Sequence, residues 1–441
     1  MTETVESRIE RDYLGEVEIP ANRQYGILTA RAVTNLSFSG TLLSGKPTFI
    51  RAMLEVKKAA SLVNMATSEL SVAKGRAIVT ACDALMEAAN WDDFVVDAYH
   101  GGGGIATNVN VNEVVAHVAG MGVDATNDVN GSQSTADACH TALYIALYRD
   151  FEQLVASMDI LKLEMTDKVA SFAEIDTISR TCMQDGMRFK QGERFSGYKE
   201  VLERRQQKVI NAMPALLTVN LGKTVIGSGT GASKAYQAEI MNQLRDVTGL
   251  ELCLTKNGFD TAQNIDAITE LADILKLYAE TLLKICQDLR FLSSGPETGI
   301  GELVLPVLMA GSTFFPGKVN PVIPETVMQG AFSIIGKVET IHLCYRHSDT
   351  DLNVFEHMAG MQLLEIVTQL REIVTLLAER CLQGLNVNES RCTAYAKALI
   401  PIVVDLKEHF TYREVQNLLA EKTRQELLEI LEGVAINDSR I

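Results

Sequence analysis

Long stretches without glycine or proline constrain the fold of this chain more than any other feature of its sequence. Residues 141–185 contain neither residue, residues 265–292 contain neither, and residues 353–383 contain only Gly360. Glycine and proline are the residues that most often interrupt helices. These stretches therefore predict long helices, and a helix over residues 265–292 would extend roughly 40 Å at 1.5 Å per residue.

The predicted helix over residues 265–292 is apolar on more than one side. One side carries Ile268, Leu271, Leu275, Tyr278, Leu282, Ile285 and Leu289, and another carries Ile274, Leu277 and Leu283. A helix that is apolar on several sides must be buried on several sides. Hydrophobic residues make up 47% of the chain, enough for a sizeable core. We therefore predict an all-α fold built on a bundle of long helices.

The charge and the apolar runs of the chain exclude several classes of partner. The formal net charge is −16, which argues against a nucleic-acid partner. No apolar run reaches the length of a membrane span, and the N-terminus lacks the pattern of a signal peptide. We expect a cytoplasmic protein without a membrane partner. An acidic chain that binds an acidic small molecule needs a locally positive pocket.

The eight cysteines do not indicate a metal site. None forms a Cys-x-x-Cys pair or lies at zinc-binding spacing from a histidine. We expect most of them to be small buried hydrophobic residues in a reducing compartment. The four glycines after His100 are not followed by Gly-Lys-Ser/Thr, so they do not predict a nucleotide site. No cofactor is expected.

The stretch Gly311–Glu325 has the composition of a shaped loop. It contains three of the nine prolines and two glycines. It also carries Ser312, Thr313, Lys318 and Asn320 and no aspartate. One cation with neutral donors suits the binding of an anion. From composition alone, an ordinary turn with one surface lysine remains an equal alternative.

The same stretch resembles the signature of a known enzyme superfamily. Gly-Ser-Thr-Phe-Phe-Pro-Gly-Lys-Val-Asn-Pro, from Gly311, is similar to Gly-Ser-Ser-x-Met-Pro-x-Lys-x-Asn-Pro of the aspartase/fumarase superfamily. It departs from that signature at residues 313–315. The following Val-Ile-Pro-Glu is more similar to the aspartate ammonia-lyase branch than to the fumarase branch.

Further segments carry the resemblance through most of the chain. Ser-Gln-Ser-Thr-Ala-Asp at residues 132–137 and Arg-Thr-Cys-Met-Gln-Asp at residues 180–185 resemble two other shared regions. The N-terminal arm over residues 1–46, which glycines and Pro20 should keep irregular, resembles the opening of aspartases. Serine and threonine at residues 134 and 135 would also serve simply as a helix N-cap. The match thins after Asn386.

The resemblance implies a specific architecture. A central long-helix bundle would contribute to a 20-helix core in a homotetramer, with small N- and C-terminal domains. We place these domains at residues 1–140, 141–390 and 391–441, the last one abbreviated. The resemblance also implies that each active site is shared by three subunits.

The resemblance implies a lyase that removes a group from a 2-substituted succinate and leaves fumarate. Ser312 matches the base that removes the Cβ proton, through an intermediate with two negative charges on one carboxylate. Preorganised donors on that carboxylate would supply most of the rate. Lys318 matches the catalytic cation. Phe314 and Phe315 are expected to be core residues, or else to exclude water from the closed site.

The residues that hold the two carboxylates of a small dicarboxylate substrate are retained. Those that match the grip on the carboxylate at the leaving-group carbon are Thr181, Lys318 and Asn320. Those that match the grip on the other carboxylate are Ser134, Thr135 and Thr313. We expect no metal and no organic cofactor in the reaction, because no metal-ligand spacing and no nucleotide loop appears and the expected base and carboxylate grips are all side chains.

The residues that match the amine sub-pocket are altered. Ile105 replaces a threonine, Ala136 replaces an asparagine, and Cys182 replaces a histidine or glutamine. An ammonium group would lose hydrogen-bonding partners at these positions. We therefore expect C–N cleavage with a leaving group other than free ammonia. We also expect Cys182, beside Met183, to be inert packing more often than a reactive thiol.

Three alternatives stay open at this point. The chain could be an ordinary aspartate ammonia-lyase with an unusual pocket. A fumarase is disfavoured by residues 322–325. A non-catalytic paralogue is disfavoured because Ser312, Lys318 and Asn320 are retained together.

Overall fold

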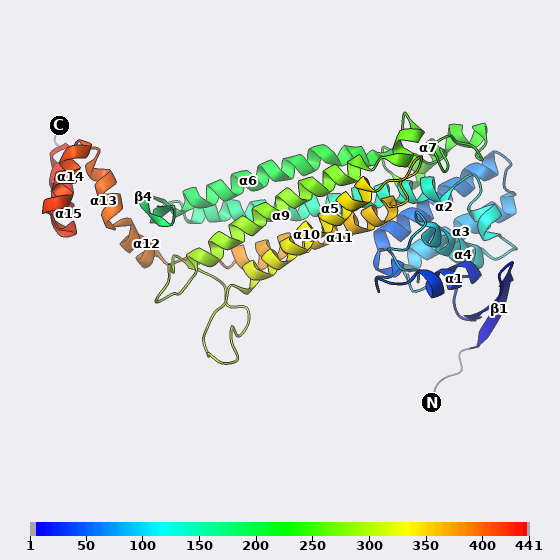
Figure 1. The fold of residues 1–441 in the computed structure, drawn as a ribbon, viewed down its shortest axis with the longest axis horizontal. Coiled ribbons are helices and arrows are strands. Elements are labelled where there is room, and N and C mark those ends of the chain that lie inside the picture. The colour runs from blue at the N-terminus through cyan, green and yellow to red at the C-terminus, as the bar shows by residue number, and fades with distance from the viewer. Residues whose placement is uncertain (1–5, 439–441) are drawn as a thin grey trace. The chain divides into compact units, whose positions relative to one another are not determined.

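A computed structural model describes residues 6–438, and the chain is mainly helical, as predicted (Figure 1). It forms two compact units, each made of several chain segments. The first unit contains residues 6–156, 207–279 and 332–371. The second unit contains residues 157–206, 280–331 and 372–438. The predicted domain boundaries at residues 140 and 390 remain predictions, and their outer ends at residues 1–5 and 439–441 lie outside the described residues.

Five long helices contribute residues to both units (Figure 1). They are α5 (Thr135–Ser171), α6 (Gln191–Ala212), α9 (Asp266–Leu292), α10 (Val322–Arg346) and α11 (Glu356–Leu376). The prediction over residues 265–292 is confirmed by α9, and α11 lies within the third predicted stretch. A π-helical turn, η4 (Leu377–Leu382), extends α11.

The prediction of one helix across residues 141–185 is wrong after Ser171. The helix α5 ends at Ser171, and β3 (Asp176–Thr181) and β4 (Gln184–Lys190) follow as an antiparallel hairpin. The main-chain N–H of Gln191 donates to the carbonyl oxygen of Ile175 over 2.8 Å, so the chain folds back on itself. Thr177 and Ile178 are buried. The absence of glycine and proline permits a helix, but tertiary packing decides where it ends.

The N-terminal arm is regular where the sequence predicted irregular structure. The strands β1 (Ser7–Asp12) and β2 (Gly15–Pro20) pair as an antiparallel hairpin. The Arg8 guanidinium donates to the carbonyl oxygens of Pro20, Arg23 and Tyr25. One arginine thereby ties the hairpin to the chain that enters α1 (Ile27–Leu36).

The rest of the first unit packs around α2 (Pro47–Ala66), most of which is buried. Ser71 caps the next helix, α3 (Val72–Ala88), because its side chain accepts from the N–H of Lys74. Residues 47–88 therefore form two helices. The remaining elements are η1 (Leu43–Gly45), α4 (Ile105–Ala119), η2 (Ala125–Val129), η3 (Met213–Leu217), β5 (Thr218–Val219), α7 (Lys234–Thr248), β6 (Cys253–Leu254) and α8 (Gly258–Gln263).

In the second unit, parts of the five long helices contact one another in a closed ring. Tyr198 of α6 donates to Asp288 of α9 over 2.7 Å. Gly330 of α10 is pressed against the Ile373 side chain of α11. The remaining contacts in the ring are Gln206 with Asp159, Thr375 with Ser157, and Arg290 with Met328. A ring of this kind is the predicted bundle.

The C-terminal part of the second unit has a small core of its own. Its buried residues are Ile402, Leu406, Val415 and Leu427. The remaining elements of the second unit are β7 (Leu303–Val304), β8 (Asn386–Val387), α12 (Glu389–Ala396), α13 (Leu399–Leu406), α14 (Tyr412–Glu421) and α15 (Arg424–Asp438). Between residues 6 and 438, no helix has both the length and the apolar composition needed to cross a membrane.

Candidate active site

The signature loop over residues 305–321 connects β7 to α10 in the second unit. A side chain at Gly311 would collide with the carbonyl oxygen of Lys318, so only glycine fits there. The amide of Asn320 donates to the carbonyl oxygen of Gly311. Gly317 adopts a φ of 83°, which favours glycine, in the turn between Phe315 and Lys318. These contacts close residues 311–320 into a defined loop.

Ser312 is held at the start of this loop by main-chain donors. Its Oγ accepts from the N–H of Phe314 over 3.0 Å and from the N–H of Phe315 over 2.9 Å. Two N–H groups directed at one oxygen favour its negatively charged form over its neutral form. These two N–H groups are one of the contributions that a serine needs in order to act as a base.

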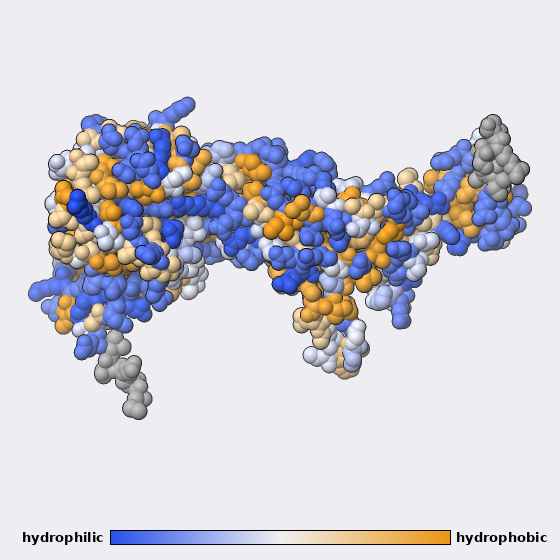
Figure 2. Space-filling view, turned by 180° about the vertical axis from the view of Figure 1, so that it is seen from behind, coloured by the Kyte–Doolittle hydropathy of each residue, from blue (hydrophilic) through white to orange (hydrophobic). Residues whose placement is uncertain are grey.

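The two phenylalanines of the loop are exposed, so the expectation that they are core residues is wrong. The side chains of Phe314 and Phe315 are 80% and 56% exposed and meet edge to face. The Lys318 Nζ lies 5.7 Å from the Phe315 ring centroid, within range of a cation–π contact. Figure 2 shows apolar atoms on this projecting loop. Local turns, not burial, set its shape.

A cavity of about 710 Å³ borders the signature loop within the second unit. Lys318 and Asn320, two residues of the expected carboxylate grip, line it. Arg290 and Glu325 also line it and form an ion pair with 3.2 Å between Nη2 and Oε1. The cavity is thus lined by the Lys318 cation, by the neutral Asn320 amide and by an arginine that is already paired with Glu325.

Thr181 and Cys182 lie at the turn of the β3–β4 hairpin, where Thr181 pairs with Gln184. Cys182 and Met183 have φ values of 53° and 61°, in the left-handed region that a two-residue hairpin turn requires. Both side chains are exposed. The expectation that Cys182 is packed beside Met183 is therefore wrong, because the turn directs both residues away from the core.

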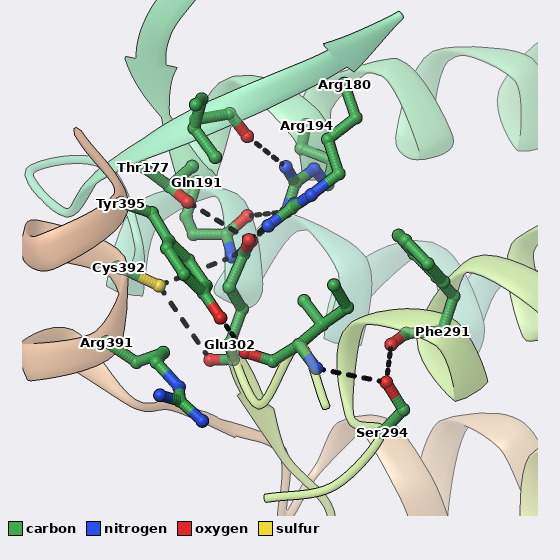
Figure 3. A network of polar contacts seen from close by, with 12 residues as sticks. Thr177, Arg180, Gln191, Arg194, Phe291, Ser294, Glu302, Arg391, Cys392 and Tyr395 are labelled. Carbon is green, nitrogen blue, oxygen red and sulfur yellow. Dashed lines mark hydrogen bonds and ion pairs between the residues drawn. The ribbon is translucent and has the colours of Figure 1, made fainter. Parts of the chain in front are cut away.

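A buried carboxylate anchors the hairpin that carries Thr181 (Figure 3). Glu302 is fully buried and forms ion pairs with Arg180 and Arg194. Its Oε2 also accepts from Thr177 over 3.1 Å and from Gln191 over 3.3 Å. Two cations and two neutral donors offset the cost of burying the charge. Glu302 holds Arg180, the neighbour of Thr181, in place.

Ser134 caps α5 in the first unit and is tied to a buried aspartate. The N–H of Ser134 donates to Asp137 Oδ1 over 2.8 Å. Asp137 Oδ2 accepts from the N–H groups of Gly222 and Thr224 over 2.9 Å and 3.0 Å. Burial raises the pKa of Asp137, against the effect of these N–H donors. The N-cap interpretation of Ser134 is confirmed, because its Oγ accepts from the N–H of Asp137 over 3.4 Å. A helix N-terminus also favours anions.

Thr135 is connected to a buried lysine that the sequence did not single out. The Thr135 Oγ1 accepts from the amide of Asn108 over 3.0 Å. The Lys57 Nζ donates to Asn108 over 2.8 Å, and to Asn130 and Gln133 over 3.0 Å each. Lys57 is completely buried, and burial lowers its pKa to about 8. A lysine on the apolar side of a helix was the only signal for this network.

Two of the three altered amine-pocket positions, Ile105 and Ala136, belong to the first unit. The helix α4 begins at Ile105, directly after Gly104, whose φ is 94°. A Cβ at Gly104 would lie 3.2 Å from the Sγ of Cys139, one turn along α5 from Ala136. The loop before Ile105 therefore contacts the start of α5.

The predicted site residues are divided between the two units. Ile105 lies with residues 134–136 in the first unit, whereas Thr181, Cys182 and the four polar residues of the signature loop lie in the second. Their convergence in one active site remains a prediction. Within residues 6–438, no group of three or more His, Cys, Asp or Glu side chains is placed to hold a metal ion.

Comparison with known proteins identifies the family. Residues 15–336 match the family described as Lyase. The aspartate ammonia-lyase of Helicobacter pylori strain J99 is 35% identical over 95% of this chain and 92% of its own length. That of Corynebacterium glutamicum is 38% identical over 90% of this chain and 78% of its own length. The chain belongs to the aspartase/fumarase family of lyases.

Solved structures agree with this assignment. A fumarate lyase:delta crystallin from Brucella melitensis, bound to cobalt, superposes with a TM-score of 0.91 at 34% identity. The superposition covers 98% of this chain and 99% of the Brucella melitensis chain. A recombinant class II fumarase from Schistosoma mansoni superposes with a TM-score of 0.90 at 25% identity, covering 97% and 96%.

Proposed function

We propose that the protein catalyses a reversible β-elimination from a 2-substituted succinate, with C–N bond cleavage, to give fumarate and an amine. The observation that carries this proposal is the pair of N–H groups, from Phe314 and Phe315, that donate to the Ser312 Oγ. The Ser312 oxygen, as the alkoxide, takes the proton from Cβ. The C–H electrons move onto the adjacent carboxylate, and their return forms the C=C bond as the C–N bond breaks.

Two groups of residues would hold the substrate carboxylates. Thr181, Lys318 and Asn320 would bind the carboxylate at the leaving-group carbon. Ser134, Thr135 and Thr313 would bind the other one, onto which negative charge develops. The buried cation of Lys57, which reaches Thr135 through Asn108, supports the second group. Charge stabilisation of this kind is effective where water is excluded.

We infer that these groups converge between subunits of a homotetramer, with three subunits at each site. The apolar exposure of the signature loop supports this, since Val307, Met309 and Phe314 are 71%, 64% and 80% exposed. Exposed apolar clusters of this kind mark interaction surfaces. Light scattering should give a tetramer. An active monomer would contradict the shared site.

The leaving group is proposed to differ from free ammonia. Ile105, Ala136 and Cys182 lack the hydrogen-bonding groups that the resemblance implies for an amine pocket. The test is fumarate absorbance with L-aspartate as the only substrate, beside the triple variant Ile105→Thr, Ala136→Asn, Cys182→His. We expect slow turnover by the natural chain and faster turnover by the triple variant.

Ordinary aspartate ammonia-lyase activity is the second candidate, because the relatives at 35–38% identity have that name. Turnover of L-aspartate at about 10 per second or more would establish it and would exclude an altered leaving group. Incubation with fumarate and a range of amines distinguishes both candidates from a non-catalytic protein, which would consume no fumarate.

A further inference from the structure

A small cavity lies at the start of α5, entirely within the first unit. Its volume is about 20 Å³, enough for one small group. Residues of the glycine-rich loop, of α5 and of the chain that enters α11 meet around it. They are Gly103, Ala136, Cys139, His140, Leu143, Leu352, Asn353, Glu356 and His357.

One polar atom on this cavity's lining residues is buried without a partner. The His140 side chain is 1% exposed, and its Nδ1 lies 2.6 Å from the Glu356 Oε1. Its Nε2 has no hydrogen-bonding partner among the described residues. An ionised carboxylate only accepts, so in the neutral imidazole the hydrogen bond to Glu356 Oε1 comes from Nδ1–H, and Nε2 is then the acceptor. A buried acceptor without a donor is costly unless a ligand supplies one.

The other titratable groups at the cavity do not compete for this role. Burial and the neighbouring His100 lower the pKa of His357 to about 3, so this imidazole is neutral. Its Nε2 already contacts Thr107 over 3.1 Å. Burial raises the pKa of the Cys139 thiol to about 12, so it is not a thiolate. The pair of His140 and Glu356 is therefore the polar end of the cavity.

Ala136 connects this polar end to the proposed site. Residues 136 and 140 are one helical turn apart on α5, so their side chains lie on one side of the helix. Both residues line the cavity. A larger side chain at position 136 would stand beside this cavity and reduce it. Alanine at position 136 therefore leaves the space beside the His140 imidazole open.

We propose that the cavity receives a second N–H group of the departing amine, and that the His140 Nε2 accepts a hydrogen bond from it. The leaving group would then be an amine with a further nitrogen donor close to the nitrogen that is released. This rests on the proposed function, in which Ala136 faces the leaving group. The Glu356 carboxylate, behind the imidazole, favours a donor there over an apolar group.

The test is the reverse reaction, in which amines add to fumarate. Hydrazine and methylamine have nearly the same size, but only hydrazine carries N–H bonds on a second nitrogen. Initial rates are followed by fumarate absorbance and expressed per unprotonated amine. We expect the hydrazine-to-methylamine ratio to fall about tenfold in His140→Phe, as for one lost hydrogen bond of about 1.4 kcal/mol. Ala136→Asn, which reduces the cavity and keeps the His140 imidazole, should lower the same ratio.

The surface substitution His117→Phe is the matched control and should leave the ratio unchanged. Melting temperature and far-ultraviolet circular dichroism show whether each variant folds. If His140→Phe does not fold, the ratio in Ala136→Asn decides. An unchanged ratio in a folded variant, with amines still adding to fumarate, overturns this inference alone. Failure of every amine to add, ammonia included, overturns the proposed function and this inference with it.

Discussion

The signature loop and the start of α5 reach defined geometry by opposite means. The loop is exposed and is held by contacts among its own residues, such as those of Ser312 and Asn320. The start of α5 is held by residues distant in sequence, with Lys57 and Asp137 both fully buried. The first region therefore leaves its functional side chains accessible, and the second leaves little room for change.

Because of this difference, substitutions in the two regions should change the reaction rate and the stability of the fold separately. Substitutions in the loop remove few buried contacts, so they should lower activity while the fold persists. Substitutions around α5 leave buried polar groups without partners, so they should lower the free energy of unfolding. The following predictions test that separation, from the largest expected effect to the smallest.

Ser312→Ala should lower kcat roughly 1,000-fold, because it removes the proposed base. The melting temperature should stay nearly constant, since the lost hydrogen bonds are in an exposed loop. Steady-state kinetics and thermal unfolding measure the two effects. Ser228→Ala is a matched control, because that exposed serine also accepts from a main-chain N–H, of Thr230. Near-normal kcat in Ser312→Ala would show that another group is the base.

Lys318→Met should lower kcat/KM about 100-fold, as expected for a lost charge-assisted hydrogen bond. Both KM and kcat should change, because the cation faces an anion in the substrate and in the transition state. The comparison with the exposed Lys256→Met controls for the loss of one positive charge. An unchanged KM would place Lys318 outside the substrate-binding groups.

Lys57→Met should lower the free energy of unfolding by about 2–3 kcal/mol, because three side-chain oxygens each lose the hydrogen bond from Nζ. Urea denaturation measures this change. Because the pKa of Lys57 is lowered to about 8, this group also sets the direction in which stability changes with pH. Between pH 8 and 10.5 the unfolded chain binds the extra proton, so this group makes stability rise with pH. The variant should lose that rise, and equal pH slopes in both proteins would contradict the assignment.

His357→Gln should flatten the acid side of the stability profile. The folded pKa of His357 is about 3, below its ordinary value of 6.5. As pH falls below 6.5 the unfolded chain takes up the proton first, so stability falls with pH through this group. At pH 5.5 the loss should be about 1.4 kcal/mol relative to pH 7.5. Denaturation at both values, in natural and variant chains, measures it, and identical losses would refute the shift.

The sequence alone determined the local features of this protein. Helical periodicity over residues 265–292 predicted α9 within one residue at its start and at its end. The signature at Gly311 identified the loop and the family, because its residues act within ten positions of one another. The N-cap at Ser134 was also readable, since a capping contact spans only three residues.

Only the tertiary structure decided the features that depend on distant partners. The hairpin at residues 176–190 replaced a predicted helix where Glu302 meets Arg180. Likewise, His140 becomes a candidate ligand only because Glu356, far along the chain, fixes its proton. Periodicity reports which side of an element is apolar, but it does not report which buried polar group lies opposite. That choice is made by packing, which brings residues hundreds of positions apart within hydrogen-bonding distance.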